Sequence, residues 1–242
     1  MKTIYYFTTL FLIFTSAAFA QSTLNYQAGT GVVIQPGADV CADKVTINGT
    51  FSGGGTICGA TAYVLNLTVF IQGFYNPASN TMVADTATVY LRSSTTPFGN
   101  IDSSKSILTS TGAGTFIFFN ITNGTNYYID VRHRNSIETW SFSAVAFSSG
   151  TLTYDFTPAA NKAYGNNMIQ VDPSPVKFGI YSGDVNQDGI IDLTDNELID
   201  NDSYNFVTGY VRTDVNGDNI VDLADAAIAD NNALNFVGKV TP

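Results

Sequence analysis

The last quarter of this 242-residue chain contains one segment twice, and this repeat limits the possible folds more than any other feature. The twelve residues 184–195 align with residues 214–225, and eight of the twelve positions are identical. Asn205-Phe206-Val207 likewise matches Asn235-Phe236-Val237, so the period is 30 residues and extends beyond the loop. A fixed period of this length indicates two copies of one supersecondary unit.

The oxygen-bearing side chains of each copy have a spacing that predicts calcium binding. Ca²⁺ takes about six to eight oxygen ligands, and a twelve-residue loop can supply them from positions 1, 3, 5, 7, 9 and 12. We therefore expect two Ca²⁺ ions, bound within residues 183–242 and contributing to the stability of that module. The expected ligands are Asp184, Asn186, Asp188, the Ile190 carbonyl, Asp192 and Asp195 for one ion, and Asp214, Asn216, Asp218, the Ile220 carbonyl, Asp222 and Asp225 for the other.

Position 12 of each loop is Asp, and one helix is expected after each loop. In these features residues 183–242 resemble the dockerin family, whose type I modules are duplicated loop-helix units. The resemblance implies attachment to a cohesin-like protein on a scaffold or cell surface, and it assigns partner reading to the residues after loop position 9, which are Leu193, Thr194, Leu223 and Ala224. Packing against the neighbouring domain of the same chain is one alternative, and thrombospondin-type calcium repeats are another.

Helices are expected from about Leu193 to Asn201 and from Leu223 to Asn231, where apolar residues can form packed faces. We expect Phe206 and Phe236 to complete the small core of this module.

Residues 63–178 are expected to form a β-sandwich, so the chain as a whole should be mostly β. Strand-like runs recur there between Gly, Pro and Asn turn signals, with no convincing helical period. The run from Gly114 to Ile121, followed by Tyr127 to Val131, resembles prealbumin-like domains, with an unspecific Ig-like sandwich as the alternative. The clearest expected strands are 64–72, 86–92, 115–121, 127–133, 139–147 and 151–156.

The N-terminus has the pattern of a secretory signal peptide over residues 1–20. A basic Lys2 precedes an apolar run, and Ala18-Phe19-Ala20 forms an A-x-A cleavage site, so the expected mature protein is exported. Residues 21–62 are expected to form a β segment bracketed by a Cys41–Cys58 disulfide, because thiols oxidise outside the cytoplasm.

The charge pattern excludes nucleic-acid binding and favours cationic partners. The chain has 20 acidic and 10 basic residues, and residues 183–242 carry 12 of the acidic and two of the basic ones. That module therefore carries the whole formal net charge of -10, and no basic surface is left to neutralise phosphates.

No catalytic motif is present in the middle of the chain, so whether this protein is an enzyme stays open, with a noncatalytic role favoured. The best candidate ligand patch there is Arg132, Arg134, Glu138 and Trp140, because aromatic rings stack on sugars and charged groups bind hydroxyls. The alternative is a structural role, in which Trp140 is a core residue and the Arg and Glu charges line the edge of a strand. A carbohydrate-binding or hydrolytic component of a polysaccharide-degrading system is therefore the second functional hypothesis.

Overall fold

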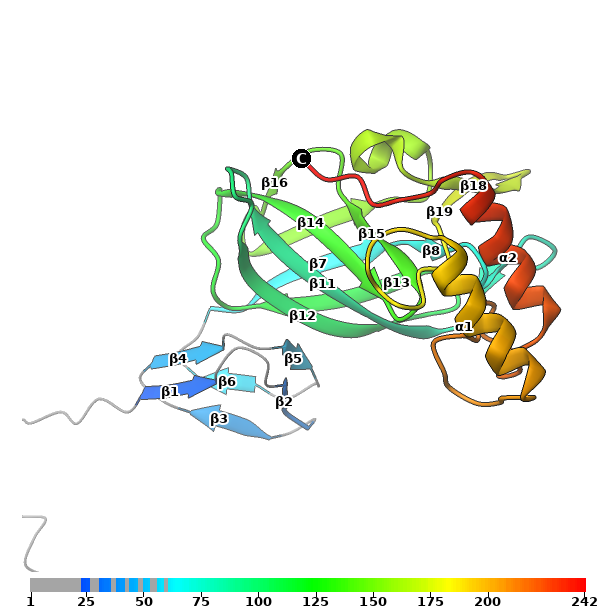
Figure 1. Cartoon of the computed structure of the whole chain (residues 1–242). Helices are drawn as coiled ribbons and strands as arrows, with labels where there is room; N and C mark the ends of the chain where they lie inside the picture. The colour runs from blue at the N-terminus through cyan, green and yellow to red at the C-terminus, as the bar shows by residue number, and fades with distance from the viewer. Residues whose placement is uncertain are drawn as a thin grey trace, which may run out of the picture.

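The computed structural model describes residues 23–26, 31–35, 38–41, 44–47, 50–52, 56–58 and 61–242. The described chain is mostly β, with α-helices confined to its last quarter (Figure 1). This agrees with the predicted fold class at that level. The predicted signal peptide lies outside the described residues. Among the residues that are described, no helix is long and apolar enough to cross a bilayer.

Short strands make up the described part of the chain before residue 61. They are β1 (Thr23–Tyr26), β2 (Gly31–Val33), β3 (Asp39–Cys41), β4 (Lys44–Ile47), β5 (Thr50–Ser52) and β6 (Thr56–Cys58). β3 pairs with β6 in parallel, and Cys41 is the register partner of Cys58. This pairing brings the two cysteine positions side by side, and the bridge between them stays a prediction.

A seven-stranded sheet forms the larger layer of the sandwich, in the order β15-β14-β11-β12-β5-β2 with β16 joined to β14. Along β11, every second residue is buried, because one face of the strand packs on the core and the other faces outward. The remaining strands of this sheet are β12 (Asn100–Leu108), β14 (Asn126–His133), β15 (Ser136–Trp140) and β16 (Val145–Ala146), beside β11 (Asp85–Ser93).

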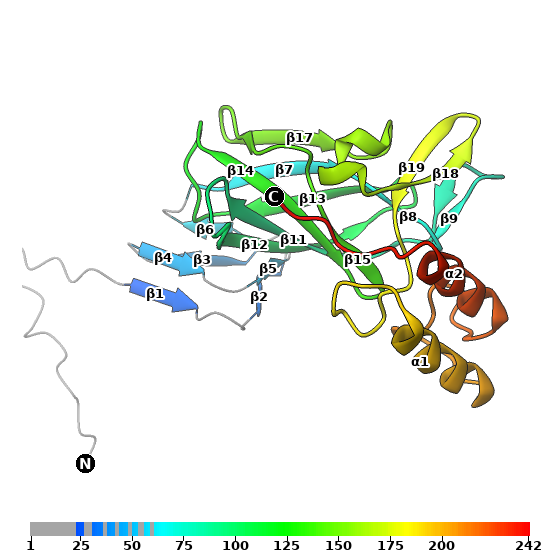
Figure 2. The same ribbon diagram turned by 45° about the horizontal axis from the view of Figure 1, so that its top comes forward.

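The second layer has the strand order β13-β7-β17 (Figure 2), from β13 (Ala113–Phe118), β7 (Tyr63–Thr68) and β17 (Thr151–Asp155). Phe116, Phe118 and Leu65 of this layer belong to the same fully buried core as Leu91 and Ile129 of the larger sheet. The remaining elements are β8 (Phe70–Ile71), β18 (Ile169–Pro173) and β19 (Val176–Ile180) in a third sheet, the pair β9 (Tyr75–Asn76) and β10 (Thr81–Met82), and the 3-10 helices η2 (Ala160–Lys162) and η3 (Tyr164–Asn166).

Two helices of equal length, α1 (Leu193–Tyr204) and α2 (Leu223–Leu234), lie at one end of the sandwich. Each begins at a capping box, in which the N-cap aspartate accepts a hydrogen bond from the helix and the N3 aspartate accepts one from the N-cap amide. Each helix runs three residues beyond the predicted end, and we call residues 183–242 the two-helix unit.

The two-helix unit has its own small core of Val185, Ile199, Val215, Val221, Ala226 and Ala229. The prediction that Phe206 and Phe236 complete this core is wrong, because their side chains are 86% and 91% exposed. Valines fill the space instead, since Val207 packs against the core and Val237 is buried against Ile137 of the sandwich and Ile191.

The C-terminal segment, residues 237–240, returns across the sandwich after α2 (Figure 1). The Lys239 amide donates to the Gly189 carbonyl, and the Gly238 carbonyl accepts a hydrogen bond from the Asn167 side chain. Val240 also forms a parallel bridge with Thr139 of β15. The end of the chain therefore connects the first loop of the two-helix unit to the sandwich.

Candidate functional site

Large apolar side chains face solvent on the two-helix unit, and we call them the helix-pair surface. Leu193 and Leu223, at the first position of each helix, are 80% and 79% exposed. Tyr204, Phe206, Leu234 and Phe236, at and after the ends of the helices, are exposed as well. The two copies contribute equivalent residues, because 30 positions separate Tyr204 from Leu234 and Phe206 from Phe236. Isolated exposed apolar residues are ordinary, whereas apolar residues that line one hollow together, as Leu193, Leu234 and Phe236 do, are typical of an interaction surface.

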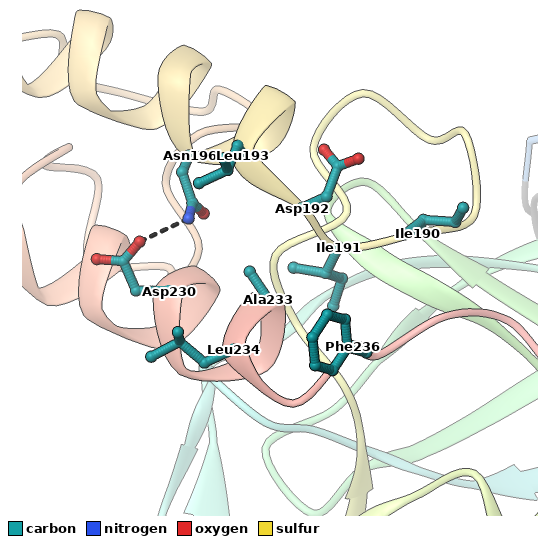
Figure 3. A pocket seen from close by; sticks show the side chains of 9 residues that line it. All are labelled: Ile190, Ile191, Asp192, Leu193, Asn196, Asp230, Ala233, Leu234 and Phe236. Carbon is teal, nitrogen blue, oxygen red and sulfur yellow. Dashed lines mark hydrogen bonds between the residues drawn. The ribbon is translucent and has the colours of Figure 1, made fainter.

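A pocket of about 610 Å³ lies on this surface and is lined by residues of both repeats (Figure 3). The start of α1 faces the end of α2 across it, and a hydrogen bond from the Asn196 amide to the Asp230 carboxylate joins the two helices. Its lining is mostly apolar and consists of Ile190, Ile191, Asp192, Leu193, Asn196, Asp230, Ala233, Leu234 and Phe236.

Phe206 and Phe236 have an unusual backbone conformation for phenylalanine. Their φ angles are 54° and 53°, in the left-handed region that favours glycine. Each residue follows the C-cap asparagine of its helix, and the amide of the next residue, Val207 or Val237, donates to the carbonyl five residues earlier, on Asp202 or Asn232. This is the Schellman arrangement, in which a bulky residue carries a conformational cost. Both copies therefore keep an exposed ring where glycine would stabilise the isolated chain.

Two of the residues assigned to partner reading, Leu193 and Leu223, belong to this surface. Leu193, Thr194, Leu223 and Ala224 are all exposed at the starts of the two helices. The more exposed rings of Phe206 and Phe236 were not predicted as surface residues, although an Asn-Phe-Val sequence directly after each helical run gives the required signal, because Asn is a frequent helix terminator.

The loops before the helices are closed by hydrogen bonds to their own carboxylates. Asp195 is fully buried, and its Oδ1 accepts from the amides of Val185 and Asn186 at 2.9 and 3.1 Å. Asp225 accepts in the same way from the amides of Val215 and Asn216 in the second loop. The two loops also share side-chain turns, in which a side-chain oxygen accepts from the backbone amide two residues further on; these acceptors are Asn186, Asp188, Asn216 and Asp218. Asp192 and Asp222 are the N-caps of the two helices.

The first carboxylates of the two loops have different surroundings, although both are buried. Asp214 accepts from the Gly217 amide and pairs with Arg134 of the sandwich, Nη2 to Oδ2, at 3.1 Å. Asp184 has no such cation, and its Oδ1 has no hydrogen-bond partner among the described residues. Burial, followed by the charges of Asp195 and Asp188, raises the pKa of Asp184 to about 7.

The prediction of two calcium ions is corrected by this arrangement. In the part of the chain that the structure describes, no group of three or more His, Cys, Asp or Glu side chains is placed to hold a metal ion. Carboxylate oxygens that the sequence assigned to calcium accept backbone hydrogen bonds instead, and one pairs with Arg134. The side chains of Ile190 and Ile220 are exposed, and Ile190 lines the apolar pocket.

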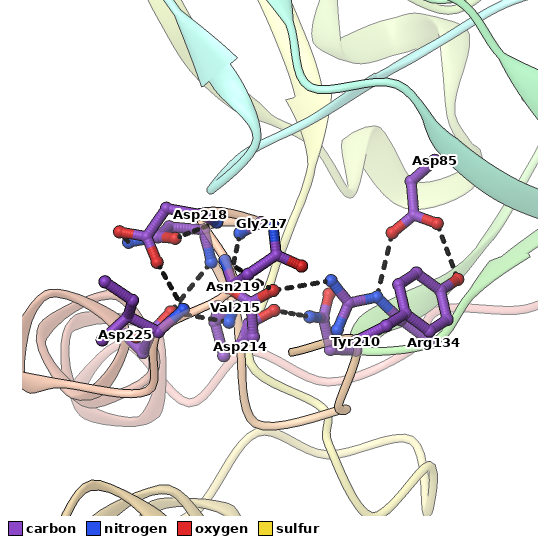
Figure 4. A network of polar contacts seen from close by, with 12 residues as sticks. Asp85, Arg134, Tyr210, Asp214, Val215, Gly217, Asp218, Asn219 and Asp225 are labelled. Carbon is purple, nitrogen blue, oxygen red and sulfur yellow. Dashed lines mark hydrogen bonds and ion pairs between the residues drawn. The ribbon is translucent and has the colours of Figure 1, made fainter. Parts of the chain in front are cut away.

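A buried polar network joins the second loop to the sandwich (Figure 4). Arg134 pairs with Asp85 at 2.9 Å as well as with Asp214, and its guanidinium lies over the Tyr210 ring, 4.5 Å from the centroid. Tyr210 donates to Asp85 at 2.7 Å. Burial opposes ionisation of Asp85, but hydrogen bonds from His133, Tyr210 and Arg134 outweigh it and hold the pKa of that carboxyl well below its usual range. Burial lowers the pKa of His133, which favours its neutral form.

The four residues of the predicted ligand patch are divided between two places. Arg134 lies in the network with the two-helix unit, with only 11% of its side chain exposed. Arg132, Glu138 and Trp140 lie together on the large sheet, where Arg132 pairs with Glu138 at 2.7 Å and Trp140 donates to Glu138 at 2.6 Å. Trp140 is buried, and its ring packs against Tyr128 and Phe98.

Comparison with known proteins gives no family for this chain: no family model and no curated protein matches it. The resemblances to dockerins and to prealbumin-like or Ig-like domains are corrected, because residues 183–242 contain two helices that by themselves do not show a dockerin module, and no family model supports either resemblance.

Solved structures that match include two interface mutants of a type II cohesin–X–dockerin complex from Acetivibrio cellulolyticus, each 17% identical to this chain. The TM-scores are 0.44 and 0.40, and the matches cover 74% and 73% of this chain and 97% and 99% of the other chains.

Proposed function

We propose that this chain is an exported attachment protein that binds another protein through the helix-pair surface. The exported location rests on the signal-peptide pattern of residues 1–20. The sandwich serves as the rigid body on which this surface is presented.

The observation that carries the proposal is the pair of exposed rings in left-handed conformation. Phe206 and Phe236 each cost the free protein stability in two ways, through the backbone angle and through apolar exposure. Local strain at an exposed position is common where the side chain has a binding role. Both costs occur in both copies, and a bound partner that covers the rings would offset the second.

The expected partner has an apolar surface surrounded by basic groups. The two-helix unit carries a net charge of -10, and the exposed carboxylates of Glu197, Asp200 and Asp230 lie on the same helices as the apolar residues. Opposite charges around an apolar centre speed association and align the two surfaces. Complex formation should therefore become slower as salt concentration rises.

The test uses the full mature chain as an immobilised bait for exported proteins of the same source. Wild type is compared with the double variant Phe206→Ala/Phe236→Ala, and Phe142→Ala, which removes an exposed ring from the sandwich, is the matched control. A protein retained by wild type and by the control is then purified, and its dissociation constant is measured against all three chains. We expect the double variant to bind at least about 100-fold more weakly.

Two results would contradict the proposal. One is equal affinity of the retained protein for wild type and for the double variant. The other is self-association: if light scattering shows a concentration-dependent dimer that the double variant loses, the rings bind a second copy of this chain and not a different protein.

A further inference from the structure

A second hollow, separate from the helix-pair surface, lies where the large sheet meets the two-helix unit. This polar groove has a volume of about 390 Å³. The outward side chains of β11, Thr86, Thr88 and Tyr90, form its floor, and Gln187 and Tyr210 of the two-helix unit line it as well. His133 and Arg134 of the polar network also line the groove, and Thr86 hydrogen-bonds Tyr210, whereas the proposed attachment uses none of this floor.

Two cationic side chains stand on either side of Thr88 in the groove. Lys105 of β12 is the register partner of Thr88 on one side, and Arg132 of β14 is its partner on the other. Neighbouring strands are roughly 4.8 Å apart, so the two residues are about 10 Å apart along this row. An anionic group above the Thr88 hydroxyl would therefore lie within reach of both cations.

Arg132 is held in place by contacts that leave part of its guanidinium to a ligand. Nε and Nη2 donate to Asp130, and Nη2 pairs with Glu138. Its guanidinium also lies 5.0 Å from the centroid of the Tyr90 ring. Asp130, two residues before Arg132 on the same face of β14, is fully buried, whereas 37% of the Arg132 side chain is exposed. The acidic groups thus orient the cation, and Arg132 lines the groove whereas Asp130 and Glu138 do not.

Lys105 is the groove cation that lacks an acidic partner among the described residues. Its side chain is exposed on β12, and no carboxylate pairs with it in the described part of the chain. A bound carboxylate would supply that partner, and charge-assisted hydrogen bonds of this kind are about twice as strong as neutral ones.

The remaining lining favours a saccharide over a peptide. Hydroxyl groups of Thr88 and Tyr90 suit the hydroxyls of a sugar. A peptide main chain would need an open strand edge, but β11 is paired on both sides, with β12 and with β14. We infer that this groove binds an oligosaccharide bearing a carboxylate, with the carboxylate between Lys105 and Arg132 above Thr88.

The surrounding charge limits the ligand further. Gln187 and Tyr210 belong to the two-helix unit, whose net charge of -10 repels a densely charged polymer. A mostly neutral saccharide with a single uronic acid avoids most of this repulsion, so it is the preferred form of the ligand.

The test measures binding of two matched probes to the full mature chain. The probes are xylotetraose and a xylotetraose that carries one glucuronic acid, and a tetraglutamate peptide serves as the alternative anion. Titration is followed by amide chemical shifts in NMR spectra. We expect saturable binding of the charged saccharide with shifts at Thr88 and Lys105, and affinity about tenfold or more lower for the neutral one.

Lys105→Gln should weaken binding of the charged saccharide about tenfold and leave the neutral one unchanged, whereas Lys162→Gln, at an exposed lysine elsewhere on the sandwich, should change neither. Both variants should keep wild-type affinity for the attachment partner, so failure here is separable from failure of the proposed attachment. The inference is overturned if the charged saccharide does not bind at millimolar concentration, if both saccharides bind equally, if Lys105→Gln has no effect, or if tetraglutamate binds more tightly.

Discussion

Replacing Phe206 with glycine is predicted to stabilise the free protein, although it removes an aromatic side chain. The left-handed backbone at Phe206 costs a residue with a Cβ atom about 1–2 kcal/mol. Glycine loses roughly 0.4–1 kcal/mol of this gain, because it makes the unfolded chain more flexible. The ring is 86% exposed, so little packing is lost. The net gain in the free energy of unfolding should be about 1 kcal/mol, or roughly 2–4 °C in Tm for a chain of this size.

The same change should weaken attachment to the partner. Covering a phenylalanine ring contributes about 1.5–3 kcal/mol, which corresponds to a loss of roughly 10- to 150-fold in affinity. Stability and affinity are therefore expected to change in opposite directions. Such a combination separates a ring retained for binding from a ring retained for folding.

The assay combines thermal unfolding of the free chain with the dissociation constant of the complex. Phe206→Ala is the informative companion, because it removes the ring and keeps the cost of the left-handed backbone, so affinity should fall without a gain in Tm. Phe236→Gly should reproduce the result in the second copy. A lower Tm for Phe206→Gly would refute the reasoning, since it would mean that the ring packs in the folded protein.

Three further changes test other parts of the structure. Arg134→Met leaves Asp85 and Asp214 buried without their shared cation. The free energy of unfolding, measured by urea titration, should fall by about 3 kcal/mol. If it does not fall, the network does not hold the two-helix unit on the sandwich. Asp184 has a pKa raised above its usual value to about 7, so the folded protein binds this proton more tightly than the unfolded chain does. Stability should therefore fall as pH rises through about 7, and Asp184→Asn should flatten this fall. Asp102→Ala removes the acceptor of the Phe119 and Asn120 amides and should cost about 2 kcal/mol, measured by the same titrations with Glu197→Ala, at an exposed carboxylate, as the control.

Many strands of the sandwich were predictable, because apolar and polar residues alternate along them and the apolar ones are buried. The expected strand 86–92 corresponds to β11, where alternate side chains enter the core. β12 was missed, since its sequence Asn-Ile-Asp-Ser-Ser-Lys-Ser-Ile-Leu is mostly polar. Two of its buried residues, Asp102 and Ser104, accept hydrogen bonds from backbone amides of the strand-end region 117–120, and such long-range partners leave no pattern in the local sequence.

The two-helix unit was predictable in its repeat and in its helices but not in the direction of its side chains. A 30-residue period fixes where each unit starts, and the capping aspartates fix where each helix begins. Hydrophobicity alone placed Phe206 and Phe236 in the core, because it does not distinguish a buried ring from one held outward by a Schellman turn. The carboxylate spacing suggested metal ions, whereas in the structure the same carboxylates close the loops by accepting amide hydrogen bonds.

The joint between the two-helix unit and the sandwich also decides how an attached molecule would be oriented. It is fixed at the second loop by Arg134, at the end of α2 by the hydrogen bonds of Asn232 to Gln72 and to the Ser182 carbonyl, and at the first loop by the C-terminal segment. A single point of fixation would leave the unit free to swivel, whereas three points at different parts of the unit remove that rotation. A partner bound to the helices would therefore keep one angle to the long axis of the sandwich, and successive molecules attached in this way would share a common orientation.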